Sequence, residues 1–281
     1  MPYRHAGEIG DVLKHLVLCE LLSSDAPARY FETNAAYPYY PLKEGAPSDY
    51  GVVFYLTHLQ GALRECAYTV LLTENEFLKN RVYYGSGAQA MQLLGYQRTA
   101  FYYFDIEPPA LQAFDAYANR LFLRRRLHTQ CADAVAPLLS DAYSFSADDF
   151  VHIDPDSPFD SNAAQQNFFS VFEKACAAGA KTLLWYGFDS FQTRDAIRAE
   201  LFRLGRTSGA QLSSFELWQR SMTGNGCAVN PGVPGCGVAL GNIAPEDAAR
   251  ISTLHTSLAA IYENARYGGA SAAFDVQALV F

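Results

Sequence analysis

Short runs of β-branched and aromatic residues alternate along this chain with longer segments in which apolar residues recur every three or four positions. The short runs predict buried strands, and the longer segments predict amphipathic helices. Their alternation indicates the α/β class, a mostly parallel sheet with helices on both faces. The predicted strands are 29–33, 100–104, 127–131, 150–153 and 182–186, with two or three more from residue 215 onward, and the predicted helices are 9–22, 109–121, 132–139, 163–177 and 245–262.

One stretch after the first predicted strand breaks this alternation. Residues 52–63 and 67–78 both carry a helical pattern, and no strand pattern separates them. At 281 residues the chain has the length of one large domain with a small insertion. We therefore expect a single domain over residues 1–281, with a helical insertion over residues 45–80.

Composition and charge narrow the class of protein. Half of the residues are hydrophobic and 18% are charged, as in globular proteins. No apolar run reaches the roughly 18 residues of a spanning helix, and no apolar leader opens the chain, so we expect a cytoplasmic protein without a membrane partner. The six cysteines fit neither a zinc site nor a disulfide framework, so no metal is expected. The net charge of −8 disfavours RNA as a partner without forbidding a local basic patch.

Acidic residues follow three of the predicted strands. Glu32, Asp105 and Asp154 each stand at or just after a carboxyl end. Ligands of open α/β sheets bind beyond these ends, so we expect the three acids to converge on one crevice. Asp105 suits the two hydroxyls of a ribose, because one carboxylate accepts two O–H donors. The alternative is that Asp105 caps the helix that begins near Pro108.

The segment after Glu32 contains no glycine. It reads N-A-A-Y-P-Y-Y over residues 34–40, so a pyrophosphate has no glycine loop to approach and a dinucleotide is disfavoured. Tyrosines gather near the predicted strand ends, where a ring face attracts a sulfonium or ammonium, although most of them are expected to be core or rim residues. They are Tyr37, Tyr39, Tyr40, Tyr83, Tyr84, Tyr102, Tyr103 and Tyr186.

Two further groups leave a choice open. Asp154 and Asp156 flank Pro155, and they are either general-base candidates or solvated acids on a proline-stiffened turn. His15 follows Lys14 in the first predicted helix, and it is either a hydrogen-bonded structural residue or a functional one. The residues alone thus indicate a cofactor-binding α/β enzyme.

The segment H-A-G-E-I-G-D-V-L-K-H at residues 5–15 resembles the N-terminal H-A-G-N-x-A-D-V-L-K-H signature of the bacterial RlmJ-type 23S ribosomal RNA adenine-N6 methyltransferases. Further matches occur in the family's order and span most of the chain: Y-F-E-T at 30–33, Y-Y-G-S at 83–86, A-D at 132–133, I-D-P at 153–155 and L-W-Y at 184–186. The resemblance implies a class I S-adenosylmethionine (SAM) methyltransferase fold with a helical insertion after the first strand.

The resemblance also implies SAM as the bound cofactor or substrate. Asp154 stands where the family places its catalytic acid, and Asp156 is a second candidate for that role. Asn34 occupies the position of a cofactor-contacting histidine. The full set of predicted SAM contacts is His15, Asn34, Tyr37, Gly87, Asp105, Asp133 and Pro155.

Two departures from the family pattern change the expected reaction. Where the family has G-A-G after the first strand, this chain has Ala36-Tyr37-Pro38, which must reshape the pocket around the methionine end of SAM. Where the family has D-P-P-Y, whose tyrosine stacks on a flipped base, this chain has Asp156-Ser157 in place of the second proline and the tyrosine. Unless Phe159 replaces that ring, about 1–3 kcal/mol of base stacking is lost.

Three functions are consistent with these features. In the first, the α-amine of SAM attacks its own γ-carbon to form azetidine-2-carboxylate and methylthioadenosine, by analogy with methyltransferase-like enzymes of natural-product pathways; Asp154 or Asp156 takes the ammonium proton. The second is N6 methylation of an adenine in 23S ribosomal RNA, which requires a basic patch near the crevice, with Arg124-Arg125-Arg126 as the dense candidate. The third is SAM binding without catalysis.

Overall fold

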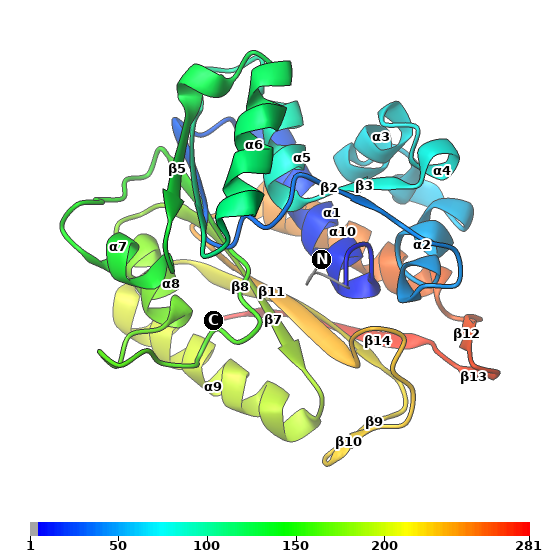
Figure 1. Ribbon diagram of the computed structural model, residues 1–281. Helices are drawn as coiled ribbons and strands as arrows, with labels where there is room; N and C mark the ends of the chain where they lie inside the picture. Colours follow the sequence, from blue (N-terminus) through cyan, green and yellow to red (C-terminus); the bar gives the residue numbers. More distant parts are fainter. Residues whose placement is uncertain (1–4) are drawn as a thin grey trace.

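An eight-stranded sheet forms the centre of the computed structural model, which describes residues 5–281 (Figure 1). The strand order is β14-β8-β11-β7-β6-β1-β4-β5. The five strands from β7 to β5 are parallel, whereas β11 is antiparallel to β7 and β8, and β14 is antiparallel to β8. The strands are β1 (Arg29–Glu32), β4 (Ala100–Asp105), β5 (Leu127–Cys131), β6 (Asp149–Ile153), β7 (Lys181–Phe188), β8 (Leu212–Gln219), β11 (Gly235–Gly241) and β14 (Phe274–Val280).

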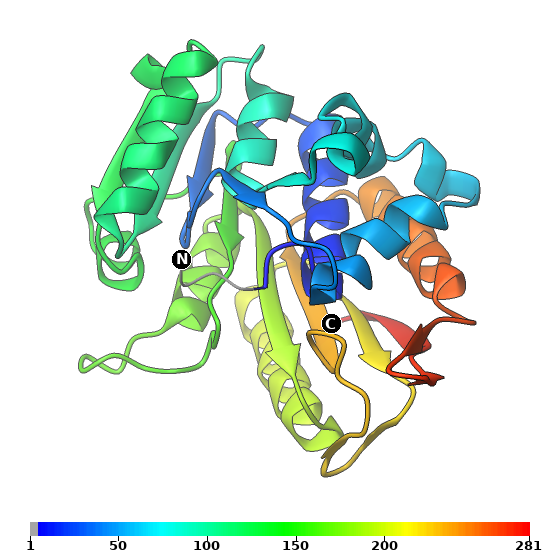
Figure 2. The same cartoon turned by 45° about the vertical axis from the view of Figure 1, so that its right-hand side comes forward.

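Helices cover both faces of this sheet (Figures 1 and 2). One face packs against α1 (Ile9–Ser24), α5 (Ser86–Leu94), α6 (Pro108–Arg120) and α10 (Pro245–Ile261). The other face packs against α7 (Val135–Leu139), α8 (Phe168–Ala177) and α9 (Phe191–Ser208). The α/β class and the mostly parallel sheet predicted from the sequence are confirmed. No helix among residues 5–281 is long and apolar enough to cross a membrane.

Short helices occupy the stretch predicted as an insertion. They are α2 (Val52–Thr57), α3 (Ala67–Glu74) and α4 (Phe77–Asn80), and α2 and α3 pack against α1. Helix α1 is therefore enclosed by the sheet, α10 and these short helices, and 13 of its residues are buried. This enclosure is why Lys14 and His15, which would be surface residues on most amphipathic helices, lie inside the protein. Among the described residues, three two-stranded antiparallel sheets pair β2 (Tyr39–Pro41) with β3 (Val82–Tyr84), β9 (Met222–Thr223) with β10 (Gly226–Cys227), and β12 (Arg266–Tyr267) with β13 (Ala270–Ser271).

Several helix boundaries differ from the predicted ones. The helix predicted over 163–177 begins at Phe168, because the Asn167 side chain accepts the Ser170 N–H at 2.9 Å and caps it there. The helix predicted over 132–139 begins at Val135, whose N–H donates to Asp133 at 2.9 Å. The pattern over 52–63 divides into α2 and a 3-10 turn, and helices α5 and α9 were not predicted.

Candidate active site

A cleft of about 810 Å³ opens at the carboxyl ends of β1, β4, β5 and β6, beside the first half of α1. It lies where ligands bind in open α/β sheets. Seven of the nine predicted site residues line it: His15, Asn34, Asp105, Asp133, Asp154, Pro155 and Asp156.

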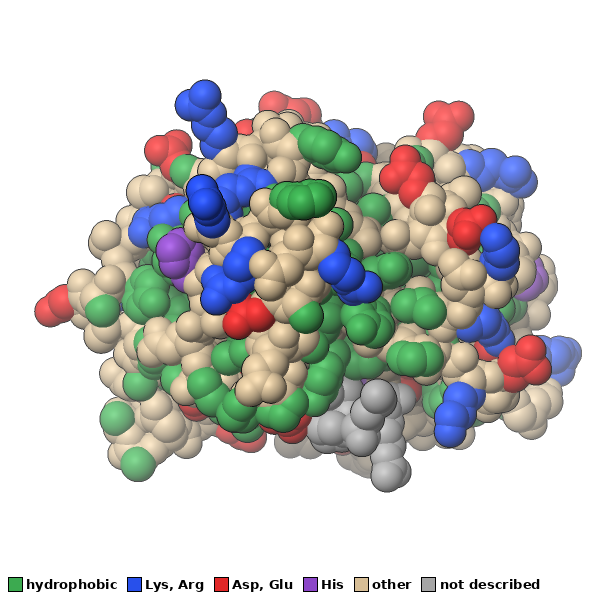
Figure 3. Space-filling view, turned by 45° about the horizontal axis from the view of Figure 1, so that its top comes forward, with side chains coloured by type: hydrophobic (Ala, Val, Ile, Leu, Met, Phe, Trp, Pro, Cys, Tyr) green, Lys and Arg blue, Asp and Glu red, His purple; other side chains and the backbone are tan. Residues whose placement is uncertain are grey.

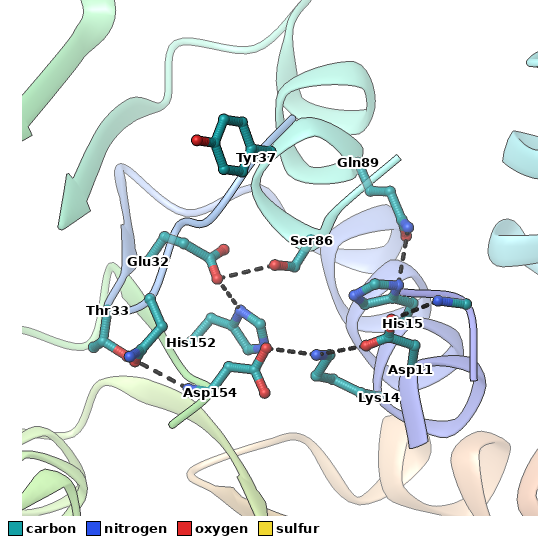
Figure 4. A network of polar contacts seen from close by, with 12 residues as sticks. Asp11, Lys14, His15, Glu32, Thr33, Tyr37, Ser86, Gln89, His152 and Asp154 are labelled. Atoms are coloured by element: carbon teal, nitrogen blue, oxygen red, sulfur yellow. Dashed lines mark hydrogen bonds and ion pairs between the residues drawn. The ribbon is translucent and has the colours of Figure 1, made fainter. Parts of the chain in front are cut away.

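Tyr37 and Gly87, the other two predicted SAM contacts, do not line the cleft. The Tyr37 N–H donates to the Tyr40 hydroxyl at 2.9 Å, and it is Tyr40 that reaches the cleft wall. Figure 4 shows the Tyr37 ring apart from the polar side chains of the site. A Cβ at Gly87 would lie 2.9 Å from the Tyr103 ring and 3.0 Å from the Phe114 ring, so this glycine allows α5 to pack closely on its neighbours. The position of Gly87 is thus explained by packing.

Asp105 is held by the backbone on both sides. Its Oδ2 accepts the Ala36 N–H at 2.7 Å, and its Oδ1 accepts the Glu107 N–H at 2.8 Å. Each carboxylate oxygen has two acceptor positions, so one remains on each oxygen for a ligand hydroxyl. Glu107, and not Asp105, is the N-cap residue of α6, so the bond from Asp105 holds the turn before the helix and does not cap the helix itself.

The turn after β1 is formed without glycine. Ala36 has a φ of 51°, in the left-handed region that costs a non-glycine residue about 1–2 kcal/mol. The bond from Ala36 to Asp105 and a bond from the Ala35 N–H to the Phe104 carbonyl at 2.9 Å hold this turn in place. The turn beside the cleft is therefore tied to the end of β4.

Lys14 lies between two carboxylates on the wall of the cleft (Figure 4). Its Nζ is 2.8 Å from Asp11 and 2.5 Å from Asp154, and only 8% of its side chain is exposed. Burial alone would lower the pKa of Lys14, but the two carboxylates outweigh it and raise that pKa above the usual lysine value. Asp11 is oriented by the Gly7 N–H, which donates to its Oδ2 at 2.8 Å.

The two carboxylates beside Lys14 have opposite proton affinities. Burial would raise the pKa of Asp11, but the attraction of Lys14 outweighs it and the pKa falls below the usual value. At Asp154, burial dominates and raises the pKa, although the charge of Lys14 opposes the rise. Asp154 therefore takes up a proton more readily than an ordinary aspartate does, while Asp11 remains ionised beside Lys14.

His15 is both a structural residue and a part of the cleft wall. The Gln89 amide nitrogen, whose identity is fixed by its bond to the Tyr84 carbonyl at 2.6 Å, donates to His15 Nδ1 at 3.0 Å. Burial lowers the pKa of His15 to about 3, so the ring is neutral and Nε2 carries the proton. Among residues 5–281, His15 Nε2 and Trp185 Nε1 have no hydrogen-bond partner, and both residues line the cleft. Both N–H groups are themselves buried behind the cleft wall.

Glu32 does not join Asp105 and Asp154 at the cleft, which corrects the prediction that all three acids converge there. Its side chain is fully buried and accepts from Tyr30, Ser86 and His152 at 2.6, 3.0 and 2.7 Å. His152, the partner on the neighbouring strand, was not singled out from the sequence, since it stands alone in a buried apolar strand.

The cleft is strongly acidic. Among residues 5–281, Lys14 is the one lysine or arginine that lines it. Seven carboxylates face this single ammonium: Glu8, Asp11, Asp105, Glu107, Asp133, Asp154 and Asp156. A cleft lined mainly by one sign of charge concentrates ligands of the opposite sign. The site therefore favours a cation and disfavours a polyphosphate.

The predicted basic patch lies elsewhere. Residues Arg124–Arg126 immediately precede β5, whereas the cleft residues Ala132 and Asp133 follow it, so the arginines are at the opposite end of the sheet. In Figure 3, basic side chains gather on the side of the molecule where Figure 1 places β5 and α6. Arg126 donates to the carbonyls of residues 95, 97 and 99, which fixes a neighbouring loop.

Phe159 does not replace the missing stacking ring. It packs against Phe169 of the core, with ring centroids 4.9 Å apart, and does not line the cleft. The large rings on the cleft wall are instead Phe168, Trp185 and Tyr40. Within residues 5–281, no three histidine, cysteine or acidic side chains are grouped so as to hold a metal ion.

Comparisons with known proteins support the fold. No protein-family model matches the chain, and no curated protein does. Protein LPL1258 from Legionella pneumophila, described by the family model DUF519, matches with a TM-score of 0.70 at 18% identity, over 97% of this chain and 98% of that chain. An O-methyltransferase from Bacillus cereus in complex with SAH gives 0.43 at 11% identity, over 81% and 80% of the two chains. An rRNA methylase from Streptococcus thermophilus gives 0.39 at 12%, over 82% and 94%. The first match shows a shared fold over nearly the whole chain, and the other two are much looser. The predicted fold class is confirmed.

Proposed function

We propose that the cleft binds SAM and that the enzyme closes the amino-acid arm of SAM into azetidine-2-carboxylate, with release of methylthioadenosine. The observation that carries this proposal is the charge of the cleft, with seven carboxylates and one lysine among the described residues. Such a lining attracts the sulfonium cation of SAM and repels the phosphates of RNA.

The polar groups of the cleft suit the parts of SAM. The remaining acceptor positions of Asp105 fit the ribose hydroxyls. The acids leave the positive centres of SAM surrounded by negative charge.

The reaction forms one bond and breaks one. The α-nitrogen bonds to the γ-carbon, and the bond from that carbon to sulfur breaks, with its electron pair remaining on the sulfur of methylthioadenosine. The attacking amine must be neutral, so the α-ammonium first loses a proton. We assign this proton to Asp154, whose pKa is raised by burial, in preference to the exposed Asp156. Positioning of the folded arm supplies much of the rate, an effect worth roughly 7–11 kcal/mol in favourable cases.

Adenine-N6 methylation of ribosomal RNA is the second candidate. It is favoured by Pro155, which is buried directly after Asp154, and by the rings of Phe168 and Trp185, which offer a surface for base stacking. The acidic lining and the distant position of Arg124–Arg126 weigh against it.

One incubation separates these functions. Pure protein is mixed with SAM alone, and the products are identified by mass spectrometry. Methylthioadenosine with azetidine-2-carboxylate supports the proposal. Formation of S-adenosylhomocysteine only when 23S ribosomal RNA is added supports the second candidate. The absence of product in both cases supports the third function, SAM binding without catalysis.

Two matched variants assign the base. Asp154→Asn should abolish turnover, whereas Asp156→Asn should keep it within a few-fold of wild type, because Asp156 is exposed at the edge of the cleft. The reverse result would transfer the role to Asp156, and full activity in both variants would remove both assignments.

A further inference from the structure

A buried carboxylate–imidazole pair lies beneath the floor of the cleft. Glu32 on β1 and His152 on β6 are directly opposite in the sheet, and both side chains are fully buried. Glu32 accepts three hydrogen bonds, one of them from His152 Nδ1 at 2.7 Å. A carboxylate that accepts from Nδ1 fixes the tautomer of the ring, so Nε2 of a neutral His152 is an acceptor with a free lone pair.

This acceptor has no partner. Among residues 5–281, no group forms a hydrogen bond with His152 Nε2, although the atom is buried. An unsatisfied buried acceptor is unfavourable, and its presence in a native structure calls for an explanation. Asp154 follows the last residue of β6, and Figure 4 shows the His152 ring between Glu32 and the Asp154 carboxylate.

We propose that His152, held by Glu32, accepts a hydrogen bond from Asp154 when Asp154 has taken the proton of the substrate. This inference rests on the proposed function in one respect, the assignment of Asp154 as the base. The proton leaves the substrate nitrogen and binds a carboxylate oxygen of Asp154, and the new O–H donates to His152 Nε2. When the product leaves, the proton passes to solvent through the cleft. His152 acts through Asp154 and is therefore a positioning residue.

The charges around this pair are consistent with such a role. Before proton transfer, Asp154 is an anion beside the Lys14 ammonium. After transfer it is neutral, and Lys14 keeps Asp11 as its counter-ion. When Asp154 is protonated, Lys14 therefore loses one of its two anionic partners, and His152 Nε2 gains the Asp154 O–H as a donor. The other ionisable groups that face this interior are Tyr30, Glu32, His15 and Tyr103.

The proposal predicts a measurable proton affinity. Loss of the acceptor removes a hydrogen bond from protonated Asp154, so the His152→Phe variant should lower the pKa of Asp154 by about one unit. The measurement is a pH titration of the carboxyl carbon by NMR in aspartate-labelled protein without SAM, with the signal assigned by its loss in Asp154→Asn. Tyr30→Phe is the matched control, because it removes a different donor from Glu32 and leaves His152 Nε2 unchanged; its titration midpoint should match that of wild type.

Two further measurements keep the proposal testable if the His152→Phe protein does not fold. One uses a second variant, and the other uses wild-type protein. Glu32→Gln keeps the shape of the pair but makes Nε2 less basic, so it should shift the Asp154 midpoint in the same direction by a smaller amount. In wild-type protein, nitrogen chemical shifts of His152 should report a neutral ring protonated on Nδ1. A charged His152 ring would lower the pKa of Asp154 by attraction. A doubly protonated ring, or an Asp154 midpoint that is unchanged or raised in whichever of the two variants folds, therefore overturns the proposal.

The activity of the same variants separates this proposal from the proposed function. In His152→Phe, the acid limb of the kcat profile should move to lower pH, with kcat about tenfold lower and KM for SAM within twofold of wild type. A shifted titration midpoint in a protein that forms no azetidine keeps the role of His152 and refutes the cyclisation. Cyclisation together with an unshifted Asp154 midpoint supports the proposed function and refutes the role of His152.

Discussion

Replacement of Lys14 by methionine tests how far the acids of the cleft depend on this one cation. Methionine keeps most of the side-chain volume but leaves Asp11 and Asp154 without their shared ammonium. The lysine side chain is 8% exposed and the two carboxylates are 18% and 17% exposed, so solvent screens the remaining charges poorly. Removal of one partner from such a pair costs about 3–5 kcal/mol, and we expect a loss of that size in the free energy of unfolding at pH 7.

The loss in Lys14→Met should depend on pH. Without Lys14, the Asp11 and Asp154 carboxylates repel each other, and protonation relieves the repulsion as the pH falls toward 5. In wild type, the pKa of Asp11 is lowered despite burial, so its stabilising contribution persists above the ordinary aspartate value of 3.8. The raised pKa of Lys14 keeps that residue charged until the pH exceeds the ordinary lysine value of 10.5. The difference between wild type and variant should therefore be largest at pH 7–8 and shrink toward pH 5.

Urea unfolding followed by circular dichroism at pH 5, 6, 7 and 8 measures this difference. Lys79→Met is the matched control, because Lys79 pairs with Glu76 at 3.1 Å while 73% and 56% of the two side chains are exposed. The free energy of unfolding of the control should stay within about 0.5 kcal/mol of wild type. A loss in Lys14→Met that is constant over this pH range, or no larger than that of the control, would refute the reasoning.

Three other changes have defined outcomes. Ala36→Gly should raise the free energy of unfolding by about 0.5–1 kcal/mol in urea titrations, because glycine adopts a φ of 51° without strain; a decrease would contradict this. Asp105→Asn should weaken SAM binding at least about tenfold in calorimetry, since an amide has one acceptor oxygen where the carboxylate has two, and unchanged affinity would remove Asp105 from the site. The double variant Arg124→Ala and Arg125→Ala should leave turnover of SAM alone unchanged, as both residues lie at the far end of the sheet; a loss would place them in the site.

The strands were predictable from the sequence to a greater extent than the helices. Buried strands such as β6 carry dense apolar side chains that leave a clear signal. Helix α5 was missed because it starts at Ser86, directly after β3, and its small residues Gly87 and Ala88 look like a turn. Helix α9 did carry a signal, with buried residues at Ile197, Leu201 and Leu204, but polar and charged residues fill most other positions.

The acids of the site were predictable because strand ends converge in this class of fold, whereas their individual partners were not. Asp105 and Asp154 reach the cleft as expected. Glu32 does not, because β1 pairs with β6 and this brings His152 opposite it from 120 residues further along the chain. Strand order of this kind is set by packing over the whole domain, and no local pattern records it. The contact between Lys14 and Asp154 could not be predicted for the same reason, because it joins residues that are distant in the sequence.

The imbalance of charge in the cleft also bears on the end of the catalytic cycle. SAM enters as a cation, but the proposed reaction turns its sulfonium into a neutral thioether. The reaction therefore removes the positive charge that attracts the substrate to the acidic cleft. Methylthioadenosine is neutral at sulfur, so the acids of the cleft no longer hold it by charge. Added salt should accordingly weaken the affinity for SAM while leaving the affinity for this product nearly constant.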